Sequence, residues 1–187
     1  YVRLLASALA SHPRFSDTLT PRYIDLLSRS APLHDIGKVG IPDHILLKPG
    51  KLTPEEWQTM RTHAKLGSDA IEEAEQDIEQ PLAFLTLAKE IAHWHHEKWD
   101  GSGYPDGLQG DAIPLSARLM ALADVFDALI SVRVYKAAMP YDEARTLILT
   151  GSGQHFDPDV VAAFDSHFEQ FVAIAERYKD DNEAQHG

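Results

Sequence analysis

Apolar residues recur at helical spacing along almost the whole chain, and no segment shows the strict alternation that a half-buried β-strand requires. No internal repeat is visible. The pattern predicts an all-α fold, a single-domain helical bundle of about seven helices over residues 1–178, followed by a polar tail at 179–187. The expected helices span residues 2–11, 21–35, 54–75, 81–97, 114–133, 140–150 and 157–178.

Local signals support two of the helix starts. Thr53 is placed to cap the helix at 54–75, with Pro54 in the first helical position and Glu56 completing a capping box. Asp157 is placed to cap the last helix. The loops at 36–52 and 98–113 are rich in glycine and proline, and long loops in compact domains often carry function.

Composition narrows the chemistry. The chain of 187 residues has no cysteine and ten histidines, so a metal would have to be held by imidazole and carboxylate groups. The formal net charge of −12 argues against a nucleic-acid polymer as partner, although local cations could still hold a small anion. No segment resembles a membrane span or a signal peptide, which favours a cytoplasmic location.

The helix expected at 114–133 carries an unusual pair of carboxylates. Asp124 and Asp127 lie nearly opposite an apolar stripe, and no Lys, Arg or Glu occurs between Arg118 and Arg133. A solvated helix face would normally carry lysine and glutamate as well. The two aspartates therefore suggest burial against cations rather than simple exposure.

Histidines gather at three other places. His95 ends an inward-facing stripe, and His96 follows it directly before a glycine-rich loop. His34 and Asp35 end an earlier helix, and His63 lies in the next one. His93 lies off these stripes and is assigned a structural role. Asp35 could give one carboxylate oxygen to each of two metals, and such ligand sets suit iron, manganese, nickel or zinc.

Taken with their spacing, these residues resemble the HD-GYP family of cyclic dinucleotide phosphodiesterases, a branch of the HD phosphohydrolase superfamily. The resemblance covers about residues 22–170, and the ordered series is far more specific than a lone His-Asp doublet. The matching residues are Leu33-His34-Asp35-Ile36-Gly37-Lys38, Ile41-Pro42, Leu46, Lys48-Pro49-Gly50, Leu52-Thr53, His63, Gly67, His95-His96-Glu97, Asp100-Gly101-Ser102-Gly103-Tyr104-Pro105, Ala123-Asp124-Val125-Phe126-Asp127-Ala128-Leu129, Arg133, Tyr135-Lys136 and Phe156-Asp157-Pro158.

The resemblance implies a helical bundle of the HD phosphohydrolase type. It implies two divalent transition metals, iron or manganese with nickel or zinc as alternatives, and places Asp35 as the bridge. The implied ligands are His34, Asp35, His63, His95, His96 and Asp124. Asp35 and Lys38 would be catalytic. Lys38, Arg133 and Lys136 would contact substrate phosphates or nearby acidic groups, Asp127 would order the basic residues, and Tyr104 and Pro105 would shape the substrate wall.

The implied activity is hydrolysis of cyclic di-GMP to linear pGpG, GMP or both. Two alternatives stay open: an HD phosphohydrolase of another cyclic dinucleotide or nucleotide, and a weakly active binding or signalling module. The family places a further His on the helix before the HD motif, and here that position would fall just before Tyr1. The expectation is therefore a truncated N-terminus with one incomplete metal shell. A sensor or receiver domain would precede it, and a homodimer is compatible with the family.

Overall fold

The computed structural model describes residues 1–76, 82–131 and 138–186, with side chains as far as Lys179. These residues form helices and short 3-10 segments without a β-strand, so the all-α prediction is confirmed. The elements are α1 (Val2–Leu9), α2 (Pro21–Ser30), η1 (Ala31–Leu33), η2 (Ile36–Gly40), α3 (Asp43–Leu46), α4 (Pro54–Arg61), α5 (His63–Gln76), α6 (Ala83–Trp94), η3 (Gly110–Ala112), α7 (Leu115–Ile130), α8 (Tyr141–Thr150), α9 (Pro158–Ser166) and α10 (Phe168–His186).

The described residues form more helices than the seven expected. Two of the expected helices are divided, and a short helix, α3, lies in the loop at 36–52. The helix expected at 54–75 breaks at Thr62, whose hydroxyl donates to the Thr59 carbonyl (2.7 Å). The helix expected at 157–178 breaks at His167, where φ reaches −117°. Both breaks follow from local backbone geometry that apolar periodicity cannot detect.

Other helix ends also differ from expectation. α2 stops at Ser30 and tightens into η1, where Pro32 has no N–H to continue an α-helix. α10 continues to His186, so the end expected at residue 178 is wrong; residues 179–186 contain no glycine or proline to stop it. The two predicted caps are confirmed. The Thr53 N–H donates to Glu56 Oε2 (2.8 Å), and Asp157 Oδ1 accepts from the Asp159 N–H (2.9 Å).

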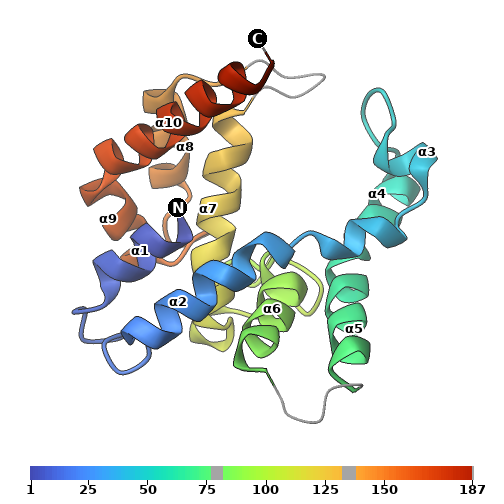
Figure 1. Cartoon of the computed structure of the whole chain (residues 1–187). Coiled ribbons are helices and arrows are strands. Elements are labelled where there is room, and N and C mark those ends of the chain that lie inside the picture. The colour runs from blue at the N-terminus through green and yellow to red at the C-terminus, as the bar shows by residue number, and fades with distance from the viewer. Residues whose placement is uncertain (77–81, 132–137, 187) are drawn as a thin grey trace.

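The main core surrounds α7, which runs through the middle of the molecule beside α1, α6, α8 and α9 (Figure 1). Phe126 of α7 packs edge-to-face on Phe164 of α9 and Phe171 of α10, with ring centroids 5.4 and 5.3 Å apart. All three rings are fully buried. Each ring buries a large apolar area, so this aromatic cluster contributes strongly to stability. No helix in the described ranges is both long and apolar enough to cross a bilayer.

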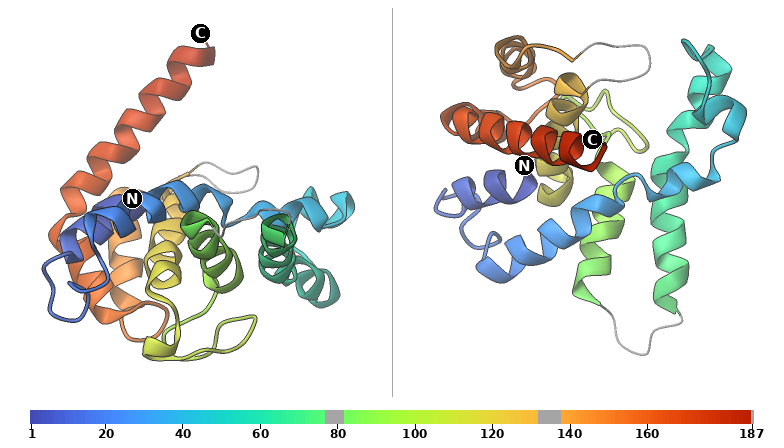
Figure 2. Two further views of the ribbon diagram at one scale, coloured as in Figure 1. Left: turned by 60° about the horizontal axis from the view of Figure 1, so that its bottom comes forward. Right: turned by 45° about the horizontal axis from the view of Figure 1, so that its top comes forward.

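A second, smaller layer consists of α5, α6 and η2. α5 and α6 lie side by side, as both views of Figure 2 show, and their own apolar cluster contains Ile71, Ala88 and Ala92. η2 lies against α5 at Gly37, where an added Cβ would come within 2.0 Å of the His63 carbonyl oxygen and 2.4 Å of the Gly67 nitrogen. The His-Asp doublet therefore reaches α5 only because residue 37 has no side chain.

This contact leads to a prediction. Gly37→Ala should lower the free energy of unfolding by about 1–3 kcal/mol or more, because the added methyl group meets backbone atoms that cannot rotate away. It should also reduce divalent-metal binding, since Asp35 and His63 lie on either side of the contact. Urea unfolding and metal titration measure both effects. Gly40→Ala is the control, because its Cβ would meet mainly the Leu66 side chain (3.0 Å). Equal stability and metal affinity in the two variants would contradict the prediction.

Candidate metal centre

Asp35, His63, His95 and His96 place four ligand atoms within 4.8 Å of one another. They come from separate parts of the fold: Asp35 precedes η2, His63 opens α5, and the two adjacent histidines follow α6. Two ligands of one transition metal lie no more than about 4.2 Å apart at bond lengths of about 2.1 Å. The four atoms therefore need only a small contraction to bind one ion.

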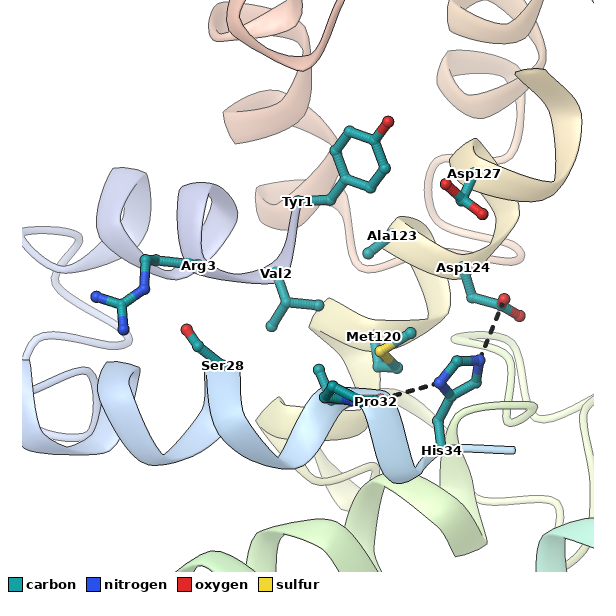
Figure 3. Close-up of a pocket in the computed structure, with 11 residues that line it drawn as sticks. Tyr1, Val2, Arg3, Ser28, Pro32, His34, Met120, Ala123, Asp124 and Asp127 are labelled. Carbon is teal, nitrogen blue, oxygen red and sulfur yellow. Dashed lines mark hydrogen bonds and ion pairs between the residues drawn. The ribbon is translucent and has the colours of Figure 1, made fainter. Parts of the chain in front are cut away.

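Asp35 lies between two sets of imidazoles. Its Oδ1 is 3.4 Å from Nε2 of His63 and 3.8 Å from Nε2 of His95. Its Oδ2 is 3.4 Å from Nε2 of His34, and that nitrogen is 3.5 Å from Asp124 Oδ1, as Figure 3 shows for the pair. The structure thus brings all six expected ligands together, with one oxygen of Asp35 facing each set.

Main-chain carbonyls orient three of the rings. A carbonyl oxygen only accepts, so Nδ1 carries a proton in each of these rings, and Nε2 presents its lone pair to the cluster whenever the ring is neutral. The pairs are His34 Nδ1 to the Ala31 oxygen (2.9 Å), His63 Nδ1 to the Met60 oxygen (2.7 Å) and His95 Nδ1 to the Ile91 oxygen (2.8 Å). The helical turn that contains each histidine therefore aims its free nitrogen.

Two further observations fit a cation. Within the described part of the chain, Nε2 of His95 is fully buried and has no hydrogen-bond partner. Nε2 of His63 and Nε2 of His96 lie 3.1 Å apart, although His63 already carries its proton on the other nitrogen. A buried lone pair without a donor is costly, and a divalent ion would satisfy Nε2 of His95 while also binding the neighbouring ring nitrogens.

The buried histidines are neutral, as metal ligands must be. Burial, together with the neighbouring His34, lowers the pKa of His95 to about 4. Burial, together with His95 and His63, lowers the pKa of His96 to about 2. Burial also lowers the pKa of His63. All three present unprotonated nitrogens at neutral pH.

His34 lies in a different electrostatic environment. Burial alone would lower its pKa, but contacts with Asp124 and Asp35 outweigh burial and raise it to about 10. Burial likewise opposes ionisation of Asp35, yet His34 and Lys38 hold the pKa of that carboxyl well below its usual range. A metal ion bound at this side would therefore displace a proton from His34.

The residues expected on the substrate side are distributed around the centre. Lys38 donates to Asp35 Oδ2 (2.5 Å). The Tyr104 ring stacks on His96, with centroids 4.8 Å apart, and Pro105 follows it at the edge of an adjacent cavity. Arg133 and Lys136 lie outside the described residues.

The two aspartates of α7 differ in burial. Asp124 is partly buried beside His34, whereas Asp127 is exposed, so the expectation of burial is wrong for Asp127. Asp127 lines two neighbouring cavities of about 430 and 480 Å³, which leave it open to solvent (Figure 3 shows the first). Its position nevertheless faces the same cavity as His34 and Asp124.

Glu97 was not among the expected site residues. Its buried carboxylate accepts from the N–H groups of Asp106 (2.7 Å), Gly107 (3.0 Å) and Leu108 (3.0 Å), and so holds the glycine-rich loop that carries Tyr104. The sequence feature that could have indicated Glu97 was its position directly after the His95–His96 pair. His93 contacts Ser68 Oγ (2.7 Å) and Asp106 (3.0 Å), away from the cluster.

The helical fold and the buried histidine–aspartate cluster agree with the family that the comparisons show. A family model described as HD domain matches residues 7–160, so the chain belongs to the HD domain family. A cyclic di-GMP phosphodiesterase of Vibrio cholerae is 61% identical over 180 residues, which are 96% of this chain and 36% of that protein. A 3'3'-cGAMP-specific phosphodiesterase 2 of Vibrio cholerae is 46% identical over 150 residues, 80% of this chain and 28% of that protein.

A solved structure of an HDG"Y"P protein from Bdellovibrio bacteriovorus superposes with a TM-score of 0.63 at 21% identity, covering 90% of this chain and 50% of that one. This likeness supports the fold. The chain spans about a third of the length of the two curated relatives.

The central place of Asp35 gives a second prediction. Asp35→Ala should lower divalent-metal content more than His34→Ala or His96→Ala does, because Asp35 faces both sets of imidazoles with its two oxygens. Plasma emission spectrometry of anaerobically purified protein measures the content. Asp25→Ala is the control, because Asp25 is an exposed residue of α2 that is paired with Arg3. A larger loss in either histidine variant would contradict the bridging position.

Proposed function

We propose that the protein is a metal-dependent phosphodiesterase that hydrolyses cyclic di-GMP to linear pGpG, GMP or both. The observation that carries the proposal is the placement of Asp35, with one oxygen toward His63 and His95 and the other toward His34. That arrangement suits two divalent ions that share a carboxylate, and the name of the 61% identical relative supplies the substrate. Iron or manganese fits the donor set, with nickel or zinc as alternatives.

When bound, two such ions would polarise the phosphoryl group, activate the attacking water and stabilise charge on the leaving oxygen. The chain's own residues supply orientation and charge. Lys38 lies beside Asp35 and is about two-fifths exposed, so it can turn toward a phosphate at the cluster. Tyr104, stacked on His96, forms one wall of the site. Arg133 and Lys136 would hold substrate phosphates, and Asp127 would order these basic residues.

A second candidate substrate is 3'3'-cGAMP. It is favoured by the relative of that specificity, which is 46% identical over 80% of this chain. The two substrates share the phosphodiester ring and one guanine, so the metal cluster alone does not separate them. Competition between them is therefore part of the same experiment.

Turnover is the direct test. We expect anaerobically purified, metal-loaded protein to convert cyclic di-GMP to pGpG or GMP, with kcat/KM at least about tenfold above that for 3'3'-cGAMP. Chromatography of the products with equal substrate concentrations measures the ratio. A chelator-treated sample and the Asp35→Ala variant are the controls, and both should be inactive. Preference for 3'3'-cGAMP would favour the second candidate, and binding without turnover would indicate a signalling module.

The basic residues give a separate prediction. Arg133→Ala and Lys136→Ala should each raise the KM for cyclic di-GMP by about tenfold while leaving metal content unchanged, because a cation that holds phosphate does not ligate the metal. Steady-state kinetics and metal analysis on the same samples test this. Arg22→Ala and Lys51→Ala, both exposed elsewhere, are the matched controls. Metal loss in the Arg133 or Lys136 variant would assign that residue to the metal centre.

A further inference from the structure

A cavity of about 310 Å³ lies beside the metal cluster and contains none of its ligands. α4 and α5 supply one side of the cavity and the glycine-rich loop supplies the other. Its lining consists of Gln58, Arg61, Thr62, Lys65, Tyr104 and Pro105. Ring and prolyl surfaces thus face amide, hydroxyl and cationic groups, the mixture that binds small organic ligands in a fixed orientation.

Tyr104 connects this cavity to the cluster. Its ring stacks on His96 (centroids 4.8 Å apart, 21° between planes), and the guanidinium carbon of Arg61 lies 4.3 Å from its centroid. Arg61 is therefore held at a fixed place next to a metal ligand. A substrate with its phosphate at the cluster would extend a neighbouring group past Tyr104 toward Arg61.

The two cations of the cavity differ in their partners. Lys65 is bound to Asp69 (2.6 Å) on the same helix. Arg61, by contrast, forms no ion pair with any carboxylate in the described parts of the chain. Its N–H donors remain available in the geometry that matches two adjacent acceptors. Guanine presents such a pair, O6 and N7, whereas adenine presents an amino donor beside N7.

We propose that this cavity is a guanine subsite, in which Arg61 donates to O6 and N7 of one base of the substrate while Tyr104 and Pro105 contact its face. The proposal rests on the proposed function for the identity of the substrate. A base fits better than a second phosphate because the Tyr104 ring and Pro105 line the cavity beside Arg61, and Lys65 is already paired with Asp69. Arg61 is then a residue that determines specificity.

Arg61→Ala tests the subsite with three phosphodiesters: cyclic di-GMP, cyclic di-AMP and bis(p-nitrophenyl) phosphate, which has no base. Loss of a bidentate contact to guanine should lower kcat/KM for cyclic di-GMP by about tenfold to hundredfold. Hydrolysis of bis(p-nitrophenyl) phosphate and metal content should change by less than about twofold. Arg61→Lys should not restore cyclic di-GMP turnover, since lysine keeps the charge but not the paired donors.

Arg29→Ala is the matched control. Arg29 lies on α2 with its guanidinium carbon 5.9 Å from the centroid of the Phe84 ring, and its loss should leave all three activities unchanged. An equal loss on all three substrates in Arg61→Ala would overturn the proposal, since Arg61 would then act through Tyr104 on the metal centre. Full rescue by Arg61→Lys would also overturn it and would indicate a phosphate contact.

A failure of the proposed function gives a different result. It would appear as a lack of cyclic di-GMP turnover in the unaltered, metal-loaded protein. The subsite would then be judged by calorimetric binding of GMP and AMP. At least about tenfold tighter binding of GMP, removed in Arg61→Ala, supports it. Equal affinities for the two nucleotides overturn it.

Discussion

The carboxylate of Asp35 is the interaction on which the rest of the site depends. Three imidazoles converge on Asp35 in a region where His63 and His95 are almost fully buried, and Nε2 of His95 has no hydrogen-bond partner within the described residues. Such a group is unfavourable without an anion to attract cations into it. Asp35 provides that anion and can do so only because Gly37 lets η2 touch the backbone of α5. The absence of a side chain at Gly37 therefore permits the whole arrangement.

Burying the polar groups of the site reduces the stability of the fold. Most of these groups lie in a different layer from the large aromatic cluster that stabilises the protein. The fully buried Phe126, Phe164 and Phe171 lie in the cluster around α7, whereas the layer that carries most ligands has only a small apolar cluster of its own. A short element with little burial, such as α3, can adjust its position without opening the aromatic core. A metal bound between the two layers would stabilise the smaller one, as ligand binding stabilises any folded state that binds it.

Apolar periodicity predicted the helical class, capping motifs predicted the caps at Thr53 and Asp157, and the family resemblance implied the six ligands that lie near one another in the structure. They could not predict the division of two helices, because the breaks at Thr62 and His167 depend on backbone geometry and not on polarity. They also could not separate Asp124 from Asp127, which share a helix segment without Lys, Arg or Glu but differ in what lies opposite them. Glu97 and Arg61 were missed because their partners, loop N–H groups and the Tyr104 ring, lie on the glycine-rich loop, whose path apolar periodicity does not predict.

Net charge and local charge act in opposite directions in this protein. A chain of −12 repels an anionic substrate at long range, so attraction must come from a few cations close to the site. Near the start of α7, Arg14 and Arg118 are bound to Asp111 and Asp157 and contribute to structure. Lys38 is held by Asp35, whose charge bound metal ions would offset in turn. Metal binding would therefore both complete the cluster and release Lys38 toward a phosphate, which ties the capture of an anion to a loaded centre.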